Sequence, residues 1–173
     1  MKGSIINQFI NFFWTILCFT PVFYYWMDNG ITRWLYVFIM FSLVTGVLPP
    51  NIFKYFQISY KPVLYEHLGV RFIQKFVQDG TYINRAMRKN NAGHKVVNNR
   101  ANAGKYMNTI AMYERYHFIC FMFSVFTFVY ALFNKQNGAA VFIMIANIIY
   151  NVYPILLQQY NKLRIRRLLR QTQ

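Results

Sequence analysis

Acidic side chains are scarce in this chain of 173 residues. Four acids stand against 19 Lys and Arg, so the formal net charge is +15. The four are Asp28, Glu66, Asp79 and Glu114. Asp28 falls in a turn-forming cluster, and Asp79 precedes a glycine at the predicted end of a helix. Any chemistry that needs a carboxylate therefore depends on Glu66 or Glu114.

Cysteine is also sparse, and several catalytic signatures are missing. Cys18 and Cys120 lie in apolar segments without the spacing of a metal site, so we interpret them as buried apolar side chains. The chain has neither a Gly-x-Ser-x-Gly elbow nor a Ser-His-Asp order, which argues against a covalent acyl-enzyme. The first apolar run is too long for a signal peptide and no Ala-x-Ala-like cleavage site follows it, so we expect it to be retained.

Apolar residues, in contrast, are abundant and gathered into long runs. They make up 56% of the chain, and aromatic residues make up 20%. The runs without Lys, Arg, Asp or Glu are 5–27, 34–53, 116–134 and 136–161. Because a spanning helix needs about 20 mainly apolar residues, the pattern predicts an all-α polytopic membrane protein with a single domain over residues 1–173. Its four transmembrane helices form two hairpins joined by an interfacial or cytoplasmic helical segment, 50–110; the helices are predicted at about 5–27, 32–49, 112–133 and 139–160.

The basic residues are distributed unevenly along the chain. Most lie between the second and third runs or after the fourth, while the two short hairpin tips hold only Arg33 and Lys135. By the positive-inside rule, both termini and the central segment are expected in the cytoplasm. This topology accounts for the charge without nucleic acid, so the expected partners are membrane lipids. The oligomeric state is unknown from sequence.

The central segment combines an apolar stripe with glycine-rich turns. Leu64, Leu68, Phe72 and Phe76 fall at helical spacing. This stripe predicts either a helix in the plane of the lipid headgroups or a short cytoplasmic helix packed on its own loop. Further on, a glycine turn precedes His94 and Lys95. Such a turn can offer backbone N–H groups and a cation to a phosphate, although a solvated loop has the same composition.

Polar side chains recur along one face of several predicted spans. The fourth span carries Asn147, Asn151, Gln158 and Asn161. Amides in hydrocarbon must find partners, so the polar faces are expected to point at one another. These residues can link helices by hydrogen bonds, or they can bind the polar part of a substrate.

Glu114 and His117 are the ionisable residues of the third span. Their three-residue step places both on one helix face, and ionisable groups within a membrane commonly mark a functional site. A histidine oriented by a carboxylate can take the proton of an attacking hydroxyl, so we predict both residues to be catalytic. Glu66 would be a third member if it folds against the same membrane face.

Two other interpretations of this pair are a salt bridge and half of a metal site. With Glu66 and His67, the chain could offer two Glu and two His to a metal. Only half of a paired Glu-x-x-His pattern is present, however, so no metal is expected.

Direct acyl transfer is the simplest chemistry for such a site. The donor would be a thioester of coenzyme A or of an acyl carrier protein, and no further cofactor is expected. Basic residues, including Lys95 and Arg164, would face the phosphates of the donor, and the helices would hold a lipid-like acceptor with a hydroxyl. The alternatives are a non-enzymatic membrane scaffold or partner subunit, and a small transporter, for which the inverted-repeat signature is missing.

A family resemblance extends over about residues 65–170. Its parts are an aromatic-Glu-x-x-Gly stretch at 65–69, a Glu-x-x-His stretch at 114–117, and a last span with a basic tail at 151–170. These stretches are similar to those of the glycosyl-4,4'-diaponeurosporenoate acyltransferases of bacterial carotenoid synthesis. The resemblance implies that an acyl chain is attached to the sugar of a glycosylated carotenoid. Two departures from the family pattern are Tyr153, an extra residue before a proline, and Lys162, where Arg is expected.

Overall fold

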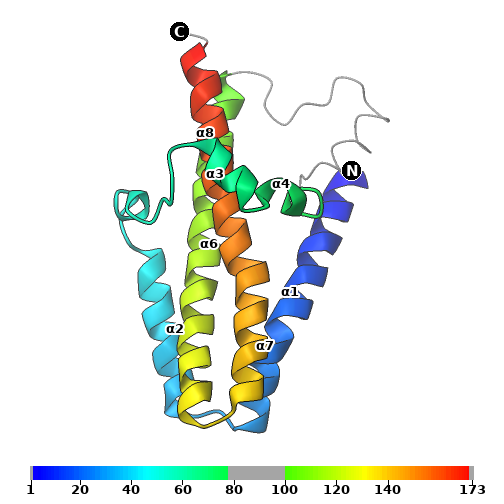
Figure 1. The fold of residues 1–173 in the computed structure, drawn as a ribbon, viewed down its shortest axis with the longest axis vertical. Coiled ribbons are helices and arrows are strands. Elements are labelled where there is room, and N and C mark those ends of the chain that lie inside the picture. Colours follow the sequence, from blue (N-terminus) through cyan, green and yellow to red (C-terminus); the bar gives the residue numbers. More distant parts are fainter. Residues whose placement is uncertain (1, 78–99, 172–173) are drawn as a thin grey trace. The chain divides into compact units, whose positions relative to one another are not determined.

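The structure is a computed structural model that describes residues 2–77 and 100–171. Every regular element within these ranges is helical, which confirms the all-α prediction for the described chain. The elements are α1 (Lys2–Asp28), α2 (Arg33–Gly46), η1 (Ile52–Lys54), α3 (Pro62–His67), α4 (Val70–Ile73), α6 (Arg100–Phe133), α7 (Asn137–Asn147), η2 (Ile148–Val152) and α8 (Tyr153–Gln171) (Figure 1). The element η1 is a 3₁₀ turn, whereas η2 is a π-helical turn that joins α7 to α8.

Three helical stretches are long and apolar enough to cross a membrane. They are Asn7–Asp28 in α1, Asn102–Phe133 in α6, and Asn137–Arg167, which runs through α7, η2 and α8. The second predicted span is different, because α2 has only 14 residues. At about 1.5 Å per residue it reaches roughly 21 Å, which is short of a hydrocarbon layer of roughly 30 Å. The helices support a membrane protein, but the predicted count of four spans is not confirmed.

Large apolar side chains cover the outside of these helices. The phenylalanines of these three stretches that are each more than half exposed include Phe9, Phe12, Phe23, Phe133 and Phe142. Water-soluble proteins rarely expose apolar surface on one helix after another, since it has to be hydrated. Contact with lipid tails removes that cost, so the distribution agrees with a membrane environment.

The described chain groups into two compact units. Unit 1 consists of Met1–Trp14, Ser59–Met112 and Leu156–Gln173, and unit 2 consists of Thr15–Ile58 and Tyr113–Ile155. The borders fall inside α1, α6 and α8, so each of these helices contributes residues to both units. The single domain predicted for residues 1–173 stays a prediction.

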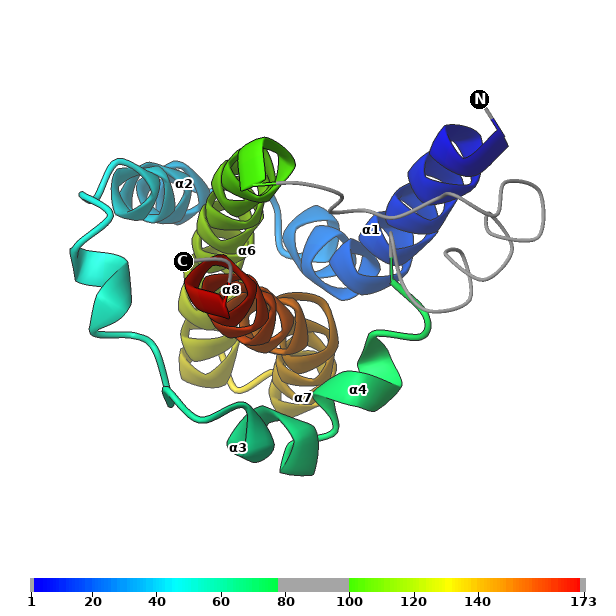
Figure 2. The same ribbon diagram turned by 90° about the horizontal axis from the view of Figure 1, so that it is seen from above.

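The core of unit 2 joins four helices. Its buried residues come from α1, α6 and α7 and are Val22, Tyr25, Trp26, Ala131, Ala140 and Ile143. Leu35 and Phe38 of α2 pack against them, and Figures 1 and 2 show the four helices side by side. Trp26 stacks on Tyr130 with ring centroids 5.5 Å apart, and its indole N–H donates to Thr127 Oγ1 over 3.3 Å. Both the apolar ring and the polar N–H of this tryptophan therefore have partners.

Unit 1 combines a small apolar contact with a buried polar one. Ala103 and Ile110 of α6 pack with Ile165 of α8. Tyr65 of α3 is fully buried, and its hydroxyl lies 3.0 Å from Oε1 of Gln159 on α8. Within this unit, α8 therefore contacts both α6 and α3.

The single helix predicted across 64–76 is wrong, because Gly69 interrupts it. Gly69 has φ 79°, in the left-handed region that favours glycine, and it separates α3 from α4. The apolar residues of the predicted stripe are all exposed, whereas Tyr65 and Val70 are buried. Asp79, His94 and Lys95 lie outside the described residues, so their predicted roles stay predictions.

Substituting Gly69 with alanine is expected to lower the free energy of unfolding by about 1–2 kcal/mol, since a side chain is strained at this positive φ. A Cβ there meets no described atom within 4 Å, so the cost comes from the backbone and not from a clash. Thermal unfolding in detergent micelles would measure it.

The matched control is Gly104→Ala in α6, where an added Cβ also meets nothing among the described atoms. Gly104 has no positive φ, so alanine adds helix propensity of about 1 kcal/mol at most. A midpoint that rises in Gly69→Ala as it does in the control would contradict the left-handed turn.

Candidate functional site

Two helices of unit 2 bring together polar side chains that the sequence singles out. His117 lies on α6, Asn147 ends α7, and Asn151 lies in η2. Tyr150, also in η2, completes the group. Asn147, Tyr150 and Asn151 are all buried and share one helix face. These four residues are termed the polar cluster.

The hydroxyl of Tyr150 connects three helical elements. It lies 2.6 Å from Thr15 Oγ1 of α1 and 3.4 Å from the hydroxyl of Tyr116 on α6. These contacts hold the Tyr150 ring at a defined place beside His117. Sequence reasoning misses Tyr150 because it is one of 14 tyrosines, and only contacts between helices distinguish it.

His117 is enclosed by aromatic rings. Its ring centroid lies 5.2 Å from that of Tyr116 and 5.4 Å from that of Tyr150, both in edge-to-face geometry. The imidazole also interacts with the Asn151 side chain and the Tyr150 backbone. Its buried Nδ1 nevertheless makes no hydrogen bond of good geometry within the described chain. An imidazole nitrogen without a partner is available to a ligand.

Glu114, the predicted partner of His117, is buried three residues earlier on α6, with 3% of its surface exposed. A carboxylate usually orients a catalytic histidine by accepting a hydrogen bond from one ring nitrogen. Because Nδ1 of His117 makes no such bond, Glu114 does not orient the imidazole through that atom. A catalytic role for Glu114 stays a prediction.

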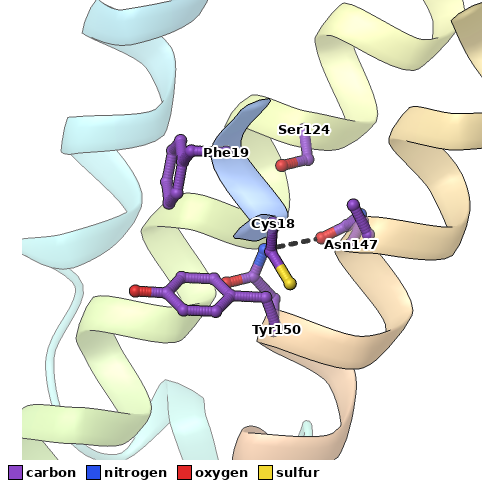
Figure 3. A pocket seen from close by; sticks show the side chains of 7 residues that line it. Cys18, Phe19, Ser124, Asn147 and Tyr150 are labelled. Atoms are coloured by element: carbon purple, nitrogen blue, oxygen red, sulfur yellow. Dashed lines mark hydrogen bonds between the residues drawn. The ribbon is translucent and has the colours of Figure 1, made fainter. Parts of the chain in front are cut away.

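A small hollow lies beside the polar cluster. Its lining residues are Cys18, Phe19, Ser124, Ala146, Asn147, Tyr150 and Asn151. Figure 3 shows the rings of Phe19 and Tyr150 on one side and Ser124 and Asn147 on the other. About 160 Å³ is unfilled, part of it open to the surroundings, and the gaps are each too narrow for a water molecule.

Unpaired polar atoms are concentrated at this place. Within the described residues, four buried side-chain polar atoms lack a hydrogen-bond partner. Three of them belong to the polar cluster: His117 Nδ1, Asn147 Nδ2 and Asn151 Oδ1. The fourth, Thr32 Oγ1, lies at the start of α2. Buried polar groups without partners are costly, so their concentration at one position indicates a place that a ligand completes.

Glu66 has its own partners in unit 1. Arg71 Nη2 donates to Glu66 Oε1 over 2.7 Å, and the hydroxyl of Tyr160 donates to the same oxygen over 3.0 Å. The hydrogen bond with Tyr160 and the negative charge of Glu66 both raise the pKa of Arg71. Glu66 and His117 belong to different units, so the predicted approach of Glu66 to His117 stays a prediction.

In the predicted polar stripe of the fourth span, the buried amide of the second half is one residue later than predicted. Gln159 is buried and bonds to the hydroxyl of Tyr65, whereas Gln158 and Asn161 are partly buried and Arg164 is exposed. The π turn η2 explains this shift, because it contains one more residue than an α-helical turn. Sequence reasoning misses Gln159 because it assumes an unbroken α-helix, and the only signal was the amide pair 158–159.

The described residues contain no group of three or more His, Cys, Asp or Glu side chains that could hold a metal ion. His67, which would supply one ligand of the metal site considered from sequence, is exposed at the end of α3.

The sequence of this chain matches a known protein family. A family model described as glycosyl-4,4'-diaponeurosporenoate acyltransferase matches residues 49–171, which is more than half of the chain. The match includes the polar cluster and Glu66, whereas α1 and α2 precede it. The resemblance inferred over about 65–170 is confirmed. Searches of curated proteins and of solved structures give no match.

Replacing Tyr65 by phenylalanine is expected to lower the free energy of unfolding by about 1–3 kcal/mol, since the buried Gln159 amide loses one partner. The same hydroxyl lies 2.8 Å from the carbonyl oxygen of Ser59 and accepts from its N–H over 3.1 Å. Denaturant unfolding would measure the loss.

The control for this substitution is Tyr55→Phe, which removes a hydroxyl from a side chain that is 88% exposed. Its expected effect is below about 0.5 kcal/mol. Equal stabilities for the two variants would show that the buried hydroxyl contributes nothing.

Proposed function

The chain belongs to the glycosyl-4,4'-diaponeurosporenoate acyltransferase family, and on that basis we propose that it transfers an acyl chain from an activated thioester to a hydroxyl of a glycosylated, carotenoid-like lipid. The observation that carries the proposal is the unpaired Nδ1 of His117, buried beside the unpaired amide atoms of Asn147 and Asn151. An acceptor hydroxyl needs a nitrogen that can take its proton and polar neighbours that can bind it.

The reaction forms one bond and breaks one bond. The acceptor oxygen attacks the thioester carbonyl carbon, a C–O bond forms, and the C–S bond breaks. The proton of the hydroxyl passes to the unprotonated imidazole nitrogen of His117 and leaves with the departing thiolate as a thiol. General base catalysis of this kind contributes about 10²- to 10⁴-fold to rate. No covalent enzyme intermediate is required.

The surroundings of His117 support this role. The rings of Tyr116 and Tyr150 hold the imidazole from two sides, and the hydroxyl of Tyr150 is itself held by Thr15. A base that is fixed in this way loses little freedom when the acceptor binds. In this proposal Asn147 and Asn151 bind the acceptor, while the buried Glu114 favours the protonated state of His117 that forms during transfer.

The donor is proposed to approach from the cytoplasmic side of a bacterial inner membrane. The chain after η2 is rich in cations, and these are Lys162, Arg164, Arg166, Arg167 and Arg170. By the positive-inside rule such a segment stays in the cytoplasm with both termini. Coenzyme A and carrier-protein thioesters carry phosphates that basic side chains attract. Arg164, over the ring of Tyr160 at 5.6 Å, is the best-placed candidate.

Glu66 has a supporting part in this proposal. Its carboxylate is paired with Arg71 and Tyr160, and a paired carboxylate is a poor base. We therefore assign it to holding α3 against α8 within unit 1. The catalytic proton is assigned to His117 alone.

The His117→Gln variant is expected to lose at least about 100-fold in the rate of acyl transfer, because the glutamine amide cannot take the proton of the acceptor hydroxyl. Cells that supply the glycosylated pigment would be compared with and without each variant by mass spectrometry of extracted lipids. The product is an acyl-sized increase in mass on one glycolipid.

The matched control is His67→Gln, since His67 is an exposed histidine of the same chain. It is expected to leave the acylated product unchanged. Full activity in His117→Gln would remove this residue from the chemistry. The absence of any acylated product with the unaltered protein, together with a co-purifying protein, would favour the scaffold alternative.

A further inference from the structure

The two asparagines of the polar cluster form a half-completed hydrogen-bonding unit. Asn151 Nδ2 donates to Asn147 Oδ1 over 2.8 Å, the bond drawn in Figure 3. One donor, Asn147 Nδ2, and one acceptor, Asn151 Oδ1, make no hydrogen bond of good geometry, although the Asn151 side chain interacts with the imidazole of His117. Both residues are 2% exposed, so neither lipid nor bulk water reaches these atoms freely.

If the two asparagines served only to link helices, this would be a poor arrangement. An interhelical amide link gains most when each donor and acceptor is paired, and buried unpaired atoms cancel much of that gain. Here the amides bond to each other along one helix, and both side chains line the hollow. The arrangement is therefore better suited to receiving a group than to cohesion.

The chemistry of the two open atoms selects the group. A carbonyl oxygen can only accept and would leave Asn151 Oδ1 unpaired, and an ammonium can only donate and would leave Asn147 Nδ2 unpaired. A hydroxyl both donates and accepts, so it satisfies the two atoms together. Since the gaps of the hollow are narrower than a water molecule, a hydroxyl is also the polar group that needs the smallest opening.

We propose that Asn147 and Asn151 bind one non-reacting hydroxyl of the acceptor sugar and thereby select which neighbouring hydroxyl is acylated. This inference rests on the acyl transfer proposed above. Tyr150, which lines the hollow, has its ring 5.4 Å from that of His117, so the anchored oxygen and the reacting oxygen are assigned to adjacent positions of one sugar. The two asparagines thus determine which sugar hydroxyl is acylated as well as how tightly the sugar binds.

Entry of the hydroxyl requires a small opening of the hollow. Its gaps are narrower than a water molecule, and the ring of Tyr150 closes one side (Figure 3). That ring is held by the bond of its hydroxyl to Thr15 Oγ1. Displacement of Tyr150 from Thr15 is the movement that admits the sugar.

The test measures binding without chemistry. The full chain in detergent micelles, with no thioester present, would be titrated with dodecyl β-glucoside and with each of its monodeoxy forms, and bound glycoside counted by native mass spectrometry. We expect one deoxy form to bind about tenfold more weakly, because a site built for a hydroxyl rejects an analogue that lacks it. Equal binding of all deoxy forms would overturn the proposal.

Substitution of the amides completes the test. In Asn147→Leu and Asn151→Leu the selective deoxy penalty is expected to disappear, since the group that senses the hydroxyl is gone. The matched control, Asn137→Leu at the exposed start of α7, keeps the full penalty. A penalty that persists in both amide variants would overturn the assignment. Should the amide variants fail to fold, the deoxy series on the unaltered protein decides alone.

The binding and activity measurements together distinguish the hydroxyl site from the proposed acyl transfer. A deoxy penalty without acyl transfer in cells would keep the hydroxyl site and remove the enzymatic proposal. Acyl transfer without a deoxy penalty would keep the enzyme and remove the hydroxyl site.

Discussion

The protein must pair its own buried polar groups, because lipid offers them no hydrogen bonds. Several polar side chains of unit 2 meet this constraint across helices. Trp26 bonds to Thr127, and Tyr150 bonds to Thr15. The exceptions therefore carry information, and three of the four in the described residues gather on His117 and the two asparagines. In the proposed function the bound acceptor supplies the partners that these three residues lack.

The sequence predicted the features that follow directly from helical periodicity and apolar content. The long apolar helices were predicted, and so was the burial of Asn147, Asn151 and Glu114. The helix predicted across the central segment failed at Gly69, where one residue with φ 79° outweighs a regular apolar stripe. A periodic pattern tells which side chains would share a face if the helix continued, but it does not tell whether the helix continues.

The hydrogen-bond partners of the tyrosine hydroxyls could not be predicted from the sequence, for a different reason. Tyr65, Tyr150 and Tyr160 read as apolar packing residues in a chain that is 20% aromatic. In the structure each makes a hydrogen bond to a residue far along the chain: Tyr65 to Gln159, Tyr150 to Thr15, and Tyr160 to Glu66. Only the packing of helices decides which tyrosine finds a polar partner. Glu66 was predicted to be catalytic because acidic residues are scarce in the chain. Its contacts with Arg71 and Tyr160 likewise depend on the packing of helices and could not be predicted.

The π turn η2 joins these observations. The sequence comparison predicts Tyr153 as an extra residue relative to the family pattern, and η2 ends immediately before it. A straight α-helix with one added residue would rotate all later side chains by about 100°. A π turn contains one more residue per turn and absorbs the addition locally, so Gln159 takes the buried place that an unbroken helix would give to Gln158. The departure from α-helical geometry is confined to η2, the turn that carries Tyr150 and Asn151. An insertion of this kind alters the polar cluster while leaving the helices on either side in place.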